Sequence, residues 1–142
     1  MKVKLVDGAY AEEPCVKYLE VDSKINLYEL HLAILEAIDF ENDHLFEFFI
    51  GRNCRNRSYL LIDEDDFEFD PEEVFFDIRL EGLFTGKPKG MKLIYNFDFG
   101  DNWMFEITKT RCKAKSPEPD TEYPRLVKSE GTNPVQYPSY ED

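Results

Sequence analysis

The stretch MKLIYNFDFGDNWMFEITK, residues 91–109, constrains the fold more than any other, because apolar and polar residues alternate on both sides of one turn. One face of the predicted pair of strands holds Leu93, Tyr95, Phe97 and Phe99 before the turn and Trp103, Phe105 and Ile107 after it. Gly100-Asp101 is a glycine-first pair that favours a tight hairpin, and a wider loop that includes Asn102 fits equally well. The stretch predicts a β-hairpin with an aromatic, buried face.

The acids of this turn also allow a chemical interpretation. Asp98 and Asp101 bracket the turn, and two carboxylates can hold one Mg²⁺ ion that keeps several waters. Asp and Gly are also the residues that hairpin turns select for backbone reasons, so the structural interpretation is favoured. We treat Tyr95, Asp98, Phe99, Gly100, Asp101 and Trp103 as the motif of interest, assign no catalytic residue, and predict neither a bound metal nor a cofactor.

The first part of the chain predicts two strands followed by the main helix. Residues 1–6 and 15–21 alternate as strands do, whereas residues 26–40 repeat apolar side chains at helical spacing. Asn26 is a suitable N-cap, and Glu29 stands three residues on, as in a capping box.

Further strands, one short helix and an irregular tail are predicted beyond this point. Residues 44–50 and 58–62 are typical of strands and are joined by a polar connector. Asp70 as N-cap and Pro71 as first helical residue predict a short second helix, which ends at the TGKPKG segment. The segment 116–142 contains five prolines, and we expect it to pack on, or trail from, the domain formed by residues 1–115. The pattern as a whole predicts an α+β fold with a mixed or antiparallel sheet.

Composition limits the classes of partner. The chain has 142 residues, enough for one domain, and 42% of them are hydrophobic. Its 30 acids outnumber its 17 bases and give a net charge of −13. Each phosphate contact needs a lysine or an arginine, so direct binding of DNA or RNA is disfavoured. The partner that this charge favours is another protein with a basic surface.

The chain is expected to be cytoplasmic. No stretch has the ~20 consecutive apolar residues that cross a bilayer, and the first residues do not form a secretory signal. Cys15, Cys54 and Cys112 are odd in number and widely spaced, which is typical of reduced thiols.

Other reactive side chains have simple structural interpretations. His31 and His44 are expected to pack or cap, and no spacing of Cys and His suggests a zinc site. Cys54 lies between Arg52 and Arg55, which could lower its pKa, but an inert cysteine in a connector is favoured.

Three segments of the chain resemble the plasmid pRiA4b ORF-3-like family. Residues 26–50 resemble its Leu-His helix and the His-Leu pair before a Phe-rich strand. Residues 91–109 resemble its Tyr-x-Tyr-Asp-Phe-Gly-Asp-x-Trp-x-His signature, and residues 123–138 resemble its C-terminal Tyr-Pro and Gly-x-x-Pro segment. The resemblance implies an α+β fold of ubiquitin-like form. Members of this family are largely uncharacterised, and some lie beside or within mobile elements.

The chain departs from the family pattern at positions that could carry chemistry. Phe97 stands where Tyr is usual, and Phe105 stands where His is common. The Cys-Pro-Pro-Glu-Asp segment of many members is represented only by GTNPVQY. A site that other members build from that His, Cys or Glu would be lost here, which argues against an enzymatic role.

We therefore expect a non-catalytic protein-interaction module with an acidic surface, which binds through an exposed sheet face or edge. Two alternatives remain open. One is a metal-dependent hydrolase or nuclease that uses Asp98, Asp101 and the acids of residues 63–66. The other is an acidic protein that mimics DNA.

Overall fold

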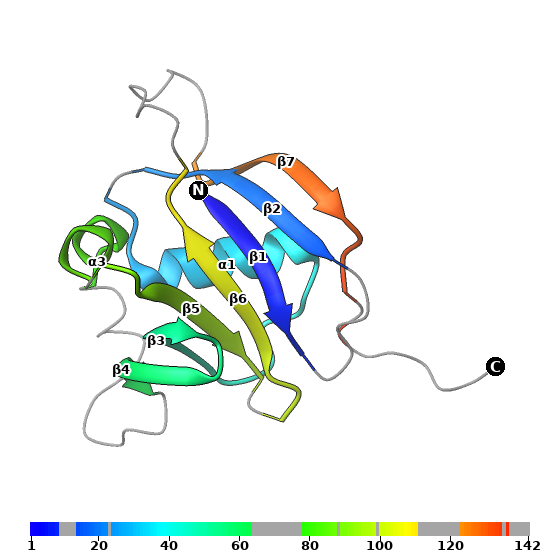
Figure 1. Ribbon diagram of the computed structural model, residues 1–142. Helices are drawn as coiled ribbons and strands as arrows, with labels where there is room; N and C mark the ends of the chain where they lie inside the picture. Colours follow the sequence, from blue (N-terminus) through cyan, green and yellow to red (C-terminus); the bar gives the residue numbers. More distant parts are fainter. Residues whose placement is uncertain are drawn as a thin grey trace.

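A computed structural model describes residues 1–8, 14–22, 24–63, 78–87, 89–98, 100–110, 123–134 and 136. Within these ranges a seven-stranded sheet carries one long helix, α1, across one of its faces (Figure 1). In chain order the strands are β1 Lys2–Asp7, β2 Cys15–Glu20, β3 Phe46–Asn53, β4 Asn56–Asp63, β5 Lys92–Phe97, β6 Trp103–Thr108 and β7 Arg125–Gly131. The helices are α1, Leu27–Ile38, and the short α3, Leu80–Gly86. Neither described helix is long and apolar enough to span a membrane.

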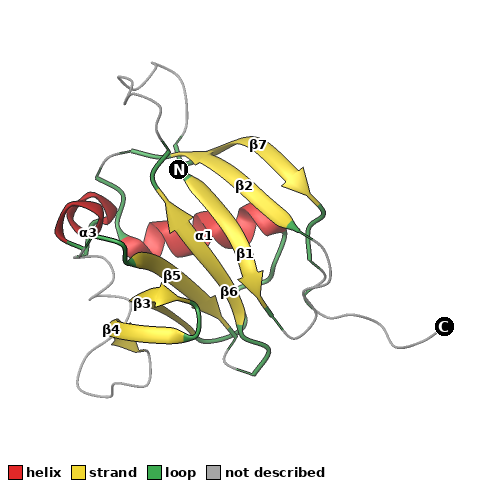
Figure 2. Ribbon diagram, viewed as in Figure 1, coloured by secondary structure: helices red, strands yellow, loops and turns green. Residues whose placement is uncertain are grey.

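The sheet is antiparallel throughout. Its strand order is β4-β3-β5-β6-β1-β2-β7, and each neighbouring pair runs antiparallel. Figure 2 shows α1 behind this sheet and α3 at the side where β5 begins. The α+β class and the antiparallel alternative are confirmed. The ubiquitin-like form is not confirmed, because a seven-stranded sheet is larger than that form implies.

Helix α1 begins at the capping box that the sequence predicts. The backbone N–H of Glu29 donates to Asn26 Oδ1 at 2.8 Å, and the N–H of Asn26 donates to Glu29 Oε1 at 3.4 Å. These two bonds satisfy N–H groups that the first helical turn leaves without partners. The helix ends at Ile38, and its C-cap Asp39 adopts the left-handed conformation, with φ of 60°.

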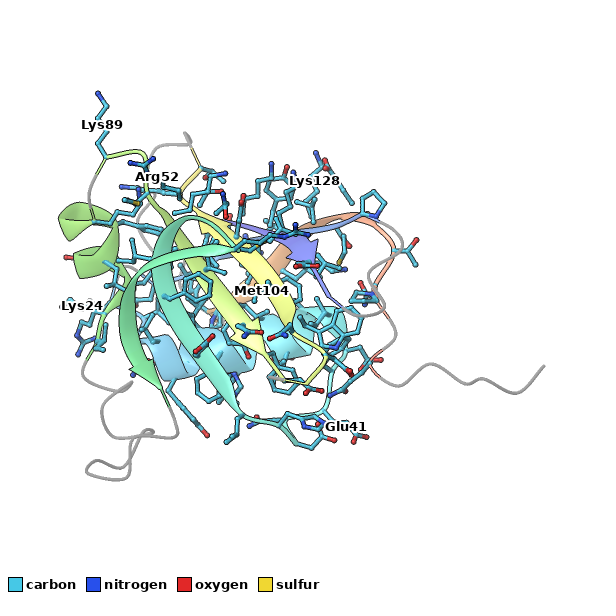
Figure 3. All side chains as sticks on the ribbon, turned by 60° about the horizontal axis from the view of Figure 1, so that its bottom comes forward. Lys24, Glu41, Arg52, Lys89, Met104 and Lys128 are labelled. Carbon is cyan, nitrogen blue, oxygen red and sulfur yellow. The ribbon has the colours of Figure 1, made fainter. Side chains whose placement is uncertain are left out.

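The main core lies between α1 and the inner face of the sheet. The motif supplies much of it, since Tyr95 and Trp103 are among the largest fully buried side chains. A smaller cluster of Phe49, Ile94 and Met104 lies on the other face, with Met104 near the middle of the sheet in Figure 3. The inward and outward residues of the β5–β6 hairpin thus follow the predicted alternation.

The polar connector predicted after residue 50 is much shorter in the structure. Strand β3 continues to Asn53 and β4 begins at Asn56, so that only Cys54 and Arg55 lie between them. The register shifts at several points along this pair. Such bulges let polar residues continue a ladder that simple alternation would end.

The described helix α3 covers the later part of the segment predicted to form the second helix. Its expected N-cap and first residue, Asp70 and Pro71, lie outside the described residues, and the described helix α3 begins at Leu80. Just before it, the backbone N–H of Leu27 donates to Ile78 O at 3.0 Å, and the N–H of Leu80 donates to Ile25 O at 3.0 Å. This short antiparallel bridge holds residues 78 and 79 extended against the start of α1.

The tail adds an edge strand that the sequence did not predict. Strand β7 pairs with β2 and is exposed along its whole length. Its end is fixed at Gly131, where φ is 79° and a Cβ atom would lie 1.9 Å from Pro14 O. Only glycine fits that position without a backbone shift.

Candidate functional site

The turn of the central hairpin is the wider of the two predicted forms. Residues 98–102 separate the strands, and both Asp98, with φ of 66°, and Asn102, with φ of 51°, adopt the left-handed conformation. Asp98 Oδ1 accepts from the backbone N–H of Gly100 at 3.1 Å and of Asp101 at 3.3 Å. The Asp98 side chain thus replaces the backbone acceptors that this turn lacks. Phe99 lies outside the described residues.

Asp98 also ties the turn to the loop that precedes β3. Its backbone N–H donates to Leu45 O at 2.8 Å, and its Oδ2 lies 3.5 Å from His44 Nε2. His44 Nε2 is in turn 3.7 Å from Asp43 Oδ1. The half-exposed imidazole of His44 therefore lies between two carboxylates.

The second histidine contacts the motif from the helix side. His31 Nδ1 lies 2.5 Å from the hydroxyl of Tyr95, and its Nε2 lies 3.0 Å from Asn42 Oδ1. Its ring stacks on Phe46 with a centroid separation of 3.7 Å. Burial lowers the pKa of His31 to about 4, against the hydrogen bond to Asn42, which raises it. The neutral ring then donates from Nε2 to Asn42 and accepts at Nδ1 from Tyr95.

An open pocket of about 470 Å³ lies next to His31 and His44. It is lined by Tyr28, His31, Asn42, Asp43, His44, Leu45 and Phe46. Gln136 holds the loop that carries Glu41 and Asp43. Its Oε1 accepts from the N–H of Glu41 at 2.7 Å, and its Nε2 donates to Asp43 Oδ1 at 3.0 Å. Glu41 marks this end of the molecule in Figure 3. A residue of the tail thus fixes the wall of the pocket.

The remaining motif residues are packed in the protein. Trp103 is 0% exposed and meets Phe40 edge to face at 5.3 Å between centroids. A Cβ atom on Gly8 would lie 2.6 Å from the Trp103 ring, so the backbone of Gly8 lies against the indole. Phe105, which stands where the family often has His, is buried with its ring 6.1 Å from that of Tyr95. These contacts assign a packing role to the aromatic residues of the hairpin.

A buried polar group beneath the turn escaped the sequence analysis. Asn96 Nδ2 donates to Glu47 Oε1 at 3.1 Å and to Asn102 Oδ1 at 3.1 Å. The alternation within residues 91–109 places Asn96 on the face of its strand opposite Tyr95, but it gives no reason to connect Asn96 with Glu47. The signal that could have indicated this pair is a lone Glu inside the Phe-rich strand, because a buried acid requires a partner.

The structure does not gather the acids into a metal site within the described ranges. The Asp98 carboxylate is used by two backbone N–H groups and faces His44. No group of three or more His, Cys, Asp or Glu side chains is placed to hold one metal ion among the described residues. Residues 64–66, which the hydrolase alternative invokes, lie outside those ranges.

Cys54 does not have the activated thiol that its arginine neighbours could have produced. Burial raises its pKa, and the carboxylate of Asp7 raises it further, while Arg55 acts in the opposite direction without reversing the shift. Its thiolate is therefore disfavoured, which agrees with an inert connector cysteine.

Two substitutions at Asp98 distinguish its role as a hydrogen-bond acceptor in the turn from the role of its negative charge. Asp98→Ala is expected to lower the free energy of unfolding by about 2 kcal/mol, because two N–H groups lose their acceptor and alanine disfavours a positive φ. Asp98→Asn keeps an acceptor and tolerates the left-handed backbone, so a loss below about 1 kcal/mol is expected. Urea denaturation measures both. Equal losses would show that the contact with His44 matters more than the turn.

Comparisons with known proteins bear separately on the fold and on the family. No curated protein matches the chain. The crystal structure of a protein of unknown function, MM3350 from Methanosarcina mazei Go1, is similar with a TM-score of 0.61 and 22% identity, over 93% of this chain and 71% of that chain. This likeness concerns the fold. The profile of the plasmid pRiA4b ORF-3-like proteins matches residues 1–136, and the chain therefore belongs to that family.

Proposed function

We propose that this protein is a non-catalytic interaction module whose acidic pocket receives an arginine side chain of a partner protein. The observation that carries the proposal is the pocket beside the hairpin turn. It brings the Tyr28 ring, the Asn42 amide and the Asp43 carboxylate around one open space of about 470 Å³.

The lining groups suit a guanidinium ion. Its planar N–H groups can donate to the carboxylate of Asp43, and its face can stack on an aromatic ring such as that of Tyr28. The tail residue Gln136 holds Asp43 in place through its Nε2, which limits the ordering that binding would require. Among the described residues, the lining contains no Ser, Thr or Cys that could act as a nucleophile.

Charge around the pocket supports the same partner. The lining residue Asp43 is an acid, and the carboxylate of Asp98 lies 3.5 Å from Nε2 of the lining residue His44. With a net charge of −13, the chain attracts a basic surface and accelerates its encounter. The free thiols of Cys15 and Cys54 accord with a cytoplasmic setting for this interaction.

A small peptide tests the pocket directly. We expect an acetylated and amidated Gly-Arg-Gly peptide to shift the amide NMR signals of residues 28 and 42–46. Asp43→Asn should weaken this binding roughly tenfold, since a charge-assisted hydrogen bond contributes about 1.5–3 kcal/mol. Glu36→Gln is the matched control, because Glu36 is an exposed acid of α1 outside the lining.

The neutral analogue of the same peptide gives the opposing result. Citrulline has nearly the shape of arginine but carries no charge, so the citrulline peptide should bind far more weakly. Equal binding of the two peptides, or equal binding to the wild type and Asp43→Asn, would contradict the proposed role of the acidic pocket.

A further inference from the structure

The opposite end of the hairpin carries the reverse charge. The turn at residues 98–102 closes one end of β5 and β6, and Lys92 and Lys109 lie at the other end, about 20 Å away along six-residue strands. A second pocket of about 240 Å³ lies there, between α3 and these strand ends. It is lined by Phe84, Lys87, Met91, Lys92, Ile107, Thr108 and Lys109. Three cationic side chains, Lys87 just after α3, Lys92 in β5 and Lys109 just after β6, thus border a small pocket of a strongly acidic protein.

Neighbouring strands extend this cationic end. Gly51 pairs with Lys92, which places Arg52 just beyond that pair, and Lys2 pairs with Thr108. Figure 3 shows Arg52 and Lys89 at the same end of the molecule.

Few carboxylates neutralise these cations. Glu106 lies 3.1 Å from the Nζ of Lys92, and so partly offsets that one charge. Among the described residues, no ion pair joins Lys87, Lys89 or Lys109 to an acid. As far as the described residues extend, two of the three lysines that line the pocket therefore keep charges that a ligand could use.

The floor of the pocket is apolar. Phe84, Met91 and Ile107 contribute a ring and two aliphatic side chains between the lysines. A free inorganic anion would leave this surface uncovered, whereas a ligand with a flat apolar body would cover it and gain the free energy of burial. The pocket therefore fits a ligand with an anionic head and an apolar body.

We propose that this second pocket binds a phosphate monoester that carries a flat ring, such as a nucleoside monophosphate. A phosphate monoester has a charge of about −1.5 to −2 at neutral pH. Such a ligand pairs with several converging lysines better than a ligand with a single carboxylate does. The hydroxyl of Thr108 in the lining is a further donor. This site is independent of the acidic pocket, because the two lie at opposite ends of the hairpin.

The same chemistry is present in a free nucleotide and at the end of a nucleic-acid strand, and net charge distinguishes them. Each further phosphate of a strand must approach a chain with a net charge of −13, while a single phosphate in the pocket meets mainly the local lysines. We expect the mononucleotide to bind at least as tightly as a five-nucleotide single strand of the same base.

Calorimetric and NMR titration with adenosine 5′-monophosphate, phenyl phosphate, inorganic phosphate and adenosine tests the site. Both esters should bind and should shift the amide signals of residues 84, 87, 91–92 and 107–109, and both should bind more tightly than inorganic phosphate or adenosine. Lys87→Gln combined with Lys109→Gln should weaken binding of the esters roughly tenfold or more. Lys24→Gln is the matched control, because Lys24 is an exposed lysine outside the lining.

Several outcomes would overturn the proposal. Adenosine that binds as well as its monophosphate would remove the role of the lysines, and inorganic phosphate that binds as well as phenyl phosphate would remove the role of the apolar floor. Equal affinities of the double variant and Lys24→Gln would show that binding occurs elsewhere. A five-nucleotide strand that binds much more tightly than the mononucleotide would identify a nucleic-acid surface instead.

Discussion

Trp103→Ala is expected to lower the free energy of unfolding by about 3–5 kcal/mol, the usual cost of deleting a large aromatic side chain from a core. The indole is 0% exposed and lies against the ring of Phe40 and the backbone of Gly8. Its removal leaves a cavity at the start of β6, where neither the strand nor Gly8 can move in without disturbing the sheet. Urea denaturation monitored by circular dichroism measures the change.

Trp103→Phe provides the control for this prediction. Phenylalanine keeps an aromatic ring in the site and fills part of the space, so the expected loss is about half that of the alanine variant. A loss below about 1 kcal/mol for Trp103→Ala would contradict the packing role and would redirect attention to a ligand-binding role for this tryptophan.

The parts of the fold that the sequence predicted depend on local patterns. The hairpin follows from alternation within residues 91–109, and α1 follows from its helical spacing and the Asn26–Glu29 capping box. The residues that decide the structure of α1 lie within one or two helical turns of one another. Those that decide the hairpin lie along a single pair of strands. Periodicity and capping record such short-range preferences directly.

The parts that the sequence missed depend on distant partners. Strand β7 is exposed on all seven residues, so no buried face marks it, and only pairing with β2 makes it a strand. The short turn between β3 and β4 depends on bulges, and the extended residues 78 and 79 depend on a bridge to the start of α1. Tertiary contacts of this kind override local propensity and leave little trace in local composition.

The candidate site likewise combines residues that the sequence identified with partners that depend on the tertiary fold. The sequence identified Tyr95 and Asp98, but their histidine partners, His31 and His44, come from other elements, and His31 is 64 positions from Tyr95. Gln136, which holds the pocket loop, is 95 positions from Glu41. A single sequence indicates which side chains are capable of chemistry, whereas the antiparallel topology decides which of them meet.

Net charge describes the chain as a whole, whereas the structure shows where along the hairpin the charges lie. A total of −13 argues against an anionic ligand for the chain as a whole. The hairpin nevertheless separates charge along its length, with acids at the turn and lysines at the strand ends. Local charge decides the choice of a small ligand, while total charge governs the approach of a large one.

Acidification should destabilise the protein through His31. The pKa of this buried imidazole is lowered to about 4 from an ordinary 6.5, so between these values the unfolded chain binds a proton that the folded chain does not. The stability that depends on the neutral ring is complete above about pH 7 and is lost as pH falls through the folded pKa. The full loss is about 3 kcal/mol, of which about 2 kcal/mol falls between pH 7.5 and pH 5.

His31→Asn removes the titrating group and keeps an oxygen that can accept from the hydroxyl of Tyr95. This variant should be less stable at pH 7.5, because stacking on Phe46 is lost, but it should lose about 2 kcal/mol less than the wild type on acidification to pH 5. Urea denaturation of the wild type and His31→Asn at the two pH values gives the comparison. An unchanged pH dependence in His31→Asn would show that His31 does not have the lowered pKa that its burial beneath the pocket produces.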